Sequence, residues 1–225
     1  MAQPHTIVTA ADVPAMVDAL LARTRVMAPV EQDGARDYAW IERGADVSVA
    51  GAIPRRSPKE ALLPRSEVLF YYRVGKGTER MAPPPEPDEQ VVFGLHPCDV
   101  RAIRVLDAVF SAEPHPDELY LSRREKTTLI SVGARPGESG DLCFCHAVGI
   151  SAMDQTDADV ALTPIDYDRY VLEVLTDKGE AIADAWASLP EASRTDVAAM
   201  ADARAQAMRT VDRSFDPETL ADKLE

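Results

Sequence analysis

Residues 90–110, QVVFGLHPCDVRAIRVLDAVF, constrain the fold more than any other stretch of this chain. The short apolar run over residues 90–95 is typical of a strand buried on both faces, as in a parallel sheet. From Val100 to Phe110 the apolar residues recur at helical spacing. A strand that runs through a short loop into a helix places that loop at the C-terminal edge of a sheet, where ligands usually bind.

The rest of the chain alternates strand-like and helix-like segments. We expect a helix over residues 9–25, strands over 38–44, 47–53, 67–74, 119–122 and 126–133, an extended proline-rich loop over 81–90, a hairpin over 159–176 with its turn near Asp166, and helices from Lys178 onward. This order predicts an α/β (or α+β) fold, with a mixed β-sheet flanked by helices and a helical C-terminal segment. We assign residues 1–175 to the mixed domain and 176–225 to a helical extension.

Composition narrows the classes of function. The 225 residues carry a formal net charge of −14, which argues against nucleic acid and against anionic membrane surfaces as partners. No apolar run approaches the roughly 20 residues that a transmembrane helix needs, and the N-terminus lacks the pattern of a secretory signal. We therefore expect a cytoplasmic protein. In that reducing compartment its three cysteines would serve metal binding or catalysis rather than disulfides.

The loop after the buried strand, His96-Pro97-Cys98-Asp99, holds three side chains that can bind metals. Pro97 favours an extended His96, and Cys98 would stand at the helix N-terminus, where the macrodipole favours a thiolate. Asp99 could be a metal ligand, but a helix cap is the favoured interpretation.

The other two cysteines form the motif Cys143-Phe144-Cys145. In an extended chain the one-residue spacing lets both thiols point the same way, with Phe144 turned toward a core. Three thiolates are one short of the Cys₄ set of most iron–sulfur clusters, so His96, Asp99, His146, a partner or a small molecule would complete the set. The surrounding glycines, which give the backbone freedom to wrap an inorganic group, are Gly133, Gly137, Gly140 and Gly149.

Taken alone, these residues leave four interpretations open. The three cysteines could bind an iron–sulfur cluster or a Cys₃His zinc ion, and Cys143 with Cys145 could form a redox dithiol. They could also be buried cysteines that act as small hydrophobic residues. No nucleotide-binding fingerprint is present, because Gly75-Lys76-Gly77 is too short for a phosphate-binding loop.

Several stretches together resemble one known family. They are FGLHPCDVRAIRVLDAVF, YLSRREKTTLISVG, CFCHAVG and YVLEVLTDKG, with RSPKEALLPRSEVLFYY upstream of them. The family contains the beta subunit of sulfhydrogenase together with its counterpart in anaerobic sulfite reductase. The likeness covers roughly residues 50 to 220, and the order of the Pro-Cys-Asp and Cys-x-Cys motifs is its most specific part.

The resemblance implies an iron–sulfur cluster, of the 4Fe–4S type, on Cys98, Cys143 and Cys145, with His96 and Asp99 as further candidate ligands and zinc as the alternative metal. It implies an electron-transfer component that is not itself the catalyst. Its partners would be a reductase that binds flavin and NAD(P), and a catalytic subunit of the hydrogenase or sulfite reductase type. The alternative function is a zinc-stabilised structural or assembly module of such a complex. His96 stands where we expect Arg in many relatives.

The same family continues past the sequence FDPETLADKLE into a ferredoxin-like module with two sets of Cys-x-x-Cys-type ligands. This chain stops at Glu225 and contains neither set. We therefore expect either an excised N-terminal domain or a natural short form.

Overall fold

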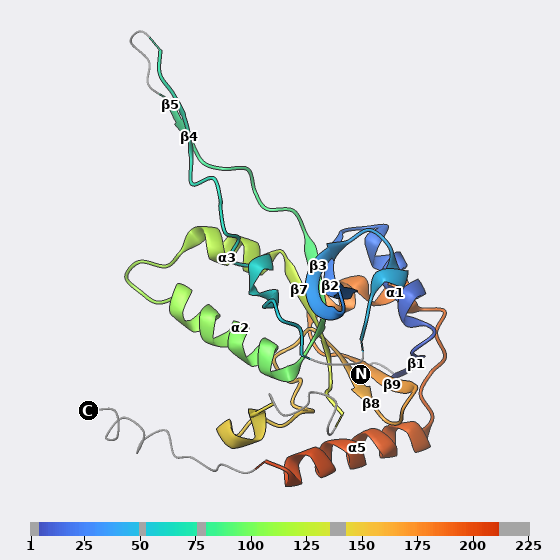
Figure 1. Ribbon diagram of the computed structural model, residues 1–225. Helices are drawn as coiled ribbons and strands as arrows, with labels where there is room; N and C mark the ends of the chain where they lie inside the picture. Colours follow the sequence, from blue (N-terminus) through green and yellow to red (C-terminus); the bar gives the residue numbers. More distant parts are fainter. Residues whose placement is uncertain (1–4, 50–52, 76–79, 136–142, 212–225) are drawn as a thin grey trace, which may run out of the picture.

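The computed structural model describes residues 5–49, 53–75, 80–135 and 143–211. These residues build a seven-stranded mixed sheet with the order β1-β9-β8-β7-β6-β2-β3 (Figure 1). The expected α/β fold is confirmed. The strands are β1 (Thr6–Thr9), β2 (Arg25–Gln32), β3 (Ala35–Ile41), β6 (Gln90–Leu95), β7 (Thr127–Val132), β8 (Val160–Pro164) and β9 (Arg169–Val174).

The centre of the sheet is parallel and its margins are antiparallel. Strands β2, β6, β7 and β8 run in one direction, whereas β3 and β9 run against their neighbours and β1 against β9. Strand β6 lies between two parallel partners, and all six of its residues are buried. This explains why its sequence is apolar without alternation, because both faces of a central parallel strand are covered.

Helices cover both faces of the sheet (Figure 1). On one face, α1 (Val13–Leu21) and the short 3₁₀ helix η5 (Asp184–Trp186) pack over a core that includes Val91 and Phe93. On the other face, α2 (Pro97–Phe110), α3 (Glu118–Glu125) and the 3₁₀ helix η2 (Pro58–Ala61) cover Val92 and Leu95. The two faces make two separate apolar cores, so residues on either side of β6 are fixed independently.

Several expected elements differ in the structure. Residues 119–122 lie in helix α3, because Asp117 caps it by accepting hydrogen bonds from the backbone N–H groups of Leu119 and Tyr120. The helix predicted over residues 9–25 is shorter, and β1 precedes it. Strand β3 pairs with the preceding β2 across a turn in which Asp33 and Gly34 have positive φ, not with residues 47–53. Among residues 47–49 and 53 there is no strand, only a single bridge to β2 and the 3₁₀ helix η1 (Gly44–Asp46) just before them.

The predicted strand over residues 67–74 is the largest departure. Only Tyr71–Arg73 form a strand, β4, which pairs with β5 (Arg80–Ala82) outside the main sheet. Its apolar side chains are exposed rather than buried. High β-propensity therefore identified an extended segment correctly but placed it in the wrong environment.

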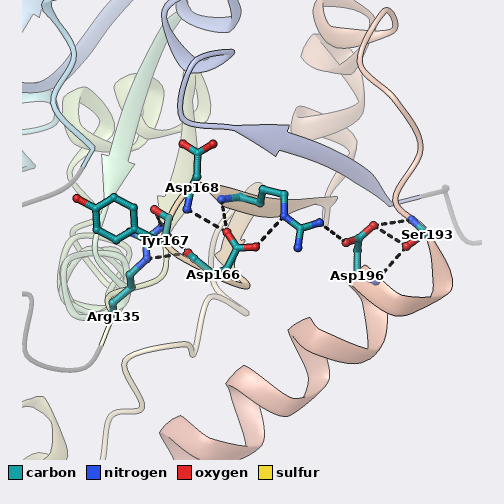
Figure 2. A network of polar contacts seen from close by, with 7 residues as sticks. Arg135, Asp166, Tyr167, Asp168, Ser193 and Asp196 are labelled. Carbon is teal, nitrogen blue, oxygen red and sulfur yellow. Dashed lines mark hydrogen bonds and ion pairs between the residues drawn. The ribbon is translucent and has the colours of Figure 1, made fainter.

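The C-terminal part follows the prediction closely. Strands β8 and β9 form the expected hairpin, followed by α4 (Asp177–Ala183), η5 and α5 (Arg194–Arg209). Arg169 bonds both Asp166 in the hairpin turn and Asp196 in the first turn of α5, where Ser193 is the N-cap (Figure 2). These contacts fix the start of α5 against the hairpin. The division of the chain after residue 175 stays a prediction.

No helix among the described residues is long and apolar enough to cross a membrane.

Tyr120 gives a pH-dependent prediction for the α2–α3 contact. Its ring stacks on Phe110 and its hydroxyl donates to Asp107 at 2.6 Å. Burial, together with Asp107, raises the pKa of Tyr120 above its usual value of 10.0. A tyrosine with a raised folded pKa contributes stability that is complete below pH 10 and is lost as pH rises further. We expect Tyr120→Phe to cost about 1 kcal/mol at pH 7, by loss of one hydrogen bond, and to flatten the decline above pH 10.

The measurement is urea denaturation at pH 7 and at pH values above 10, for the parent and for Tyr120→Phe. An equally steep alkaline decline in both proteins would show that another group causes it.

Candidate metal centre

Two neighbouring strand ends bring the cysteines together. Strands β6 and β7 are adjacent and parallel, so their C-terminal ends lie at the same edge of the sheet. Cys98 follows β6 in the first turn of α2, and Cys143 and Cys145 follow β7 in the sequence, with Cys145 at the start of η4. Because both cysteine motifs follow buried strands that are neighbours in the sheet, the two motifs come near the same edge of the sheet.

The exit of β6 is shaped by a bulge at Gly94. The register with β7 shifts between Phe93 and Leu95, and Gly94 has φ +76°. The Tyr38 hydroxyl donates to the Gly94 carbonyl at 2.9 Å and holds this bulge from β3. The bulge turns Leu95 to the same side of the sheet as Val92, which starts the turn into α2.

Helix α2 begins at the candidate ligands. His96 is extended (φ −71°, ψ 154°) and buried, and Pro97 occupies the first turn, as the sequence predicts. The Asp99 carboxylate accepts a hydrogen bond from the His96 N–H at 3.3 Å, so Asp99 closes the helix N-terminus. Burial raises the pKa of Asp99 to about 6, against the opposing effects of the His96 N–H and the Lys59 charge.

The Cys98 and Cys145 side chains are close enough for each to shift the pKa of the other. This contact is the main reason that the pKa of Cys98 is lowered, even though burial and the charge of Asp99 act in the opposite direction. The same contact raises the pKa of Cys145. Of these two thiols, Cys98 therefore forms the thiolate more readily.

Cys145 also affects the pKa of Cys143, and the charge of Cys143 acts on the pKa of Cys98. Cys145 is thus the cysteine that affects both of the others. In the described part of the chain, no three His, Cys, Asp or Glu side chains group so as to hold a single metal ion.

The Cys-x-Cys motif has a different local shape from the one expected. Cys145 begins the 3₁₀ helix η4 (Cys145–Val148), so Phe144 is not extended (φ −123°, ψ 17°). Its ring is 69% exposed, which corrects the prediction that Phe144 faces a core. Gly149 has φ +78° and ends η4, which agrees with the expected backbone freedom. Gly137 and Gly140 lie outside the described residues.

The identity of a fourth ligand, beside the three cysteines, stays a prediction. His96 is buried at the helix start, Asp99 is engaged as the cap, and His146 is exposed on η4. No sequence pattern pointed to Tyr38, a buried residue 56 positions before Gly94 that supports the β6 exit. The side chains of Arg123 and Arg124 bond within the fold, to Leu62, Glu67, Asp107 and Thr127.

A comparison with known proteins finds a distant relative. No family model matches the sequence. Sulfhydrogenase 2 subunit beta of Pyrococcus furiosus is 27% identical over 134 residues, which cover 59% of this chain and 38% of that protein. The chain is a distant relative of this protein. The match spans well under half of the relative, so the activity and the partners of the whole relative enter only as proposals.

Proposed function

We propose that this chain is an iron–sulfur electron-transfer component of a cytoplasmic oxidoreductase complex. The observation that supports this most is that Cys98, at the start of α2, and Cys145, at the start of η4, lie close enough to shift each other's pKa. The distant relationship to a sulfhydrogenase beta subunit supports a role beside a hydrogenase. Partners of the flavin- and NAD(P)-binding reductase type and of the hydrogenase or sulfite reductase type fit this role.

The donor set fits an iron–sulfur cluster better than a single zinc ion. A structural zinc site needs ligands arranged tetrahedrally around one point. A cluster has several irons, and thiolates bind it at separate corners, so cysteines from two separate segments can ligate it without converging on one point. Cys98, Cys143 and Cys145 would hold the cluster, which when bound supplies one-electron transfer.

The residues around the thiols have supporting roles. The N-terminus of α2 stabilises negative charge on Cys98, and Asp99 completes that helix end. All three cysteines are half-buried, which limits the access of water to the site. Together these features hold the Cys98 sulfur in place and favour its thiolate form.

The test is anaerobic reconstitution of the purified chain with iron and sulfide, followed by iron and zinc analysis and by electron paramagnetic resonance after reduction. We expect stoichiometric iron and a reducible cluster signal. Variant His115→Ala, in an exposed loop, should behave like the parent. A chain that takes up no iron, or that binds zinc in equimolar amount and rejects iron, would overturn the proposal; the second result would establish the zinc module instead.

A further inference from the structure

A long arm projects from the body of the molecule (Figure 1). It comprises residues 66–88, of which 66–75 and 80–88 are described, and it contains β4 and β5. Its large apolar side chains are between 48% and 73% exposed. They are Val68, Leu69, Phe70, Tyr71, Tyr72, Val74 and Met81. Exposed apolar surface of this extent on one element marks an interaction site.

Part of the backbone of the arm also lacks hydrogen-bond partners among the described residues. Strand β4 pairs only with β5, and a two-stranded ribbon is marginally stable alone in water. Among the described residues, no backbone hydrogen bond joins Val68, Leu69 or Phe70 to another segment. These residues have the composition of a strand and an open edge, which is the usual template for pairing with another chain.

The charges on the arm are arranged in two zones. At its outer end Arg73 lies directly opposite Arg80, a like-charged cross-strand pair that destabilises an isolated ribbon. At its base Glu86 and Asp88 line a cleft together with Val68 and Tyr71. None of these four charged residues forms an ion pair with another described residue. The arm is basic at its outer end and acidic at its base.

We infer that two copies of this chain associate through their arms, which lie side by side and antiparallel across a two-fold axis. In a two-fold contact both copies use the same surface, so each contact between two different residues occurs twice. Antiparallel arms place the outer arginines of one copy against the basal carboxylates of the other. The carboxylates then neutralise the Arg73–Arg80 repulsion, and the open strand edges pair.

The area of the contact agrees with this arrangement. An aromatic side chain buries roughly 150–250 Å² in full, so the three aromatic side chains of the arm, about half exposed, offer on the order of 300 Å² per copy, and the four aliphatic side chains add a similar amount. With the backbone and the charged groups added, this approaches the roughly 800 Å² per partner of a standard interface.

The experiment measures the mass of the full chain by light scattering and sedimentation, up to about 100 μM protein and at about 0.05 to 0.5 M salt. The chain mass is 24.5 kDa, so a dimer has twice that mass. We expect a dimer that dissociates at higher salt. A monomer at the highest concentration in low salt would overturn the inference, as would salt-insensitive aggregates of undefined size.

Charge reversal identifies the surface. Variant Arg73→Glu/Arg80→Glu and variant Glu86→Arg/Asp88→Arg should each weaken the dimer at least about tenfold, because like charges then face each other. Mixed in equal amounts, the two variants should form a heterodimer, since every contact is again between opposite charges. The control Arg194→Glu/Arg209→Glu changes the net charge equally on exposed residues of α5 and should leave the dimer unchanged.

Circular dichroism would show that each variant is folded. If both reversed variants dimerise as strongly as the parent, or if the mixture stays monomeric while each variant is folded, the arms are not the interface. This test involves no metal, so its result is independent of the proposed electron-transfer function.

Discussion

Replacing Cys145 by alanine is expected to abolish cluster assembly while leaving the fold intact. Cys145 is the cysteine that affects the pKa of both Cys98 and Cys143, so its loss removes the side chain that links the other two. It lies half-buried at the start of a short 3₁₀ helix and belongs to neither apolar core. Iron content and the reduced-state paramagnetic signal after reconstitution are the measurements, with thermal unfolding of the metal-free chain as the control for folding.

The same substitution has a consequence in the metal-free chain. The Cys145 thiol is the main cause of the lowered Cys98 pKa, so Cys145→Ala should raise that pKa. Because the thiolate is the nucleophile, alkylation of Cys98 near neutral pH should then slow. Mass spectrometry of the alkylated chain against pH follows this for Cys98 alone. Unchanged alkylation, or a Cys145→Ala variant that still assembles a full cluster, would contradict the arrangement of sulfurs described above.

Substitution of Gly94 by alanine should destabilise the fold by about 3 kcal/mol, the sum of backbone strain and a steric clash. Gly94 has φ +76°, and a Cβ atom there would lie 2.8 Å from Cδ and 2.9 Å from Cγ of Pro29 in the neighbouring strand β2. Both faces of β6 are packed, so the strand has little room to move aside. Urea denaturation of the metal-free chain measures the cost.

Gly34 provides the matched control. It has a similar φ of +71°, but a Cβ atom there meets nothing within 4 Å, so Gly34→Ala carries the strain alone, about 1 kcal/mol. In the double variant Pro29→Ala/Gly94→Ala the clash is removed, and its cost should fall below the sum of the single costs. Equal costs for Gly94→Ala and Gly34→Ala would show that Pro29 does not confine the β6 exit.

Much of the central fold can be predicted from local pattern. The unbroken apolar run of β6, the helical spacing after Val100 and the turn near Asp166 each predicted the element found there. Patterns failed where a single residue or a distant partner decided the outcome. The Asp117 cap made residues 119–122 helical. Pro29 weakened the strand signal of β2, which pairs with β3 over residues 26–32 and with β6 over residues 25–27. The exposed arm has strand-like composition, and composition does not report burial.

The classes of element in the central sheet and the two cysteine motifs follow from the amino-acid order, because periodicity, propensity and residue chemistry are local properties. The order of the strands does not follow from it. Only the tertiary structure places β7 parallel to β6, and this pairing brings Cys98 near Cys145, which is 47 residues further along the chain. Only the tertiary structure, likewise, leaves the arm outside the two cores. Which strand pairs with which depends on the total burial of both sheet faces, and this is a property of the whole chain rather than of any segment.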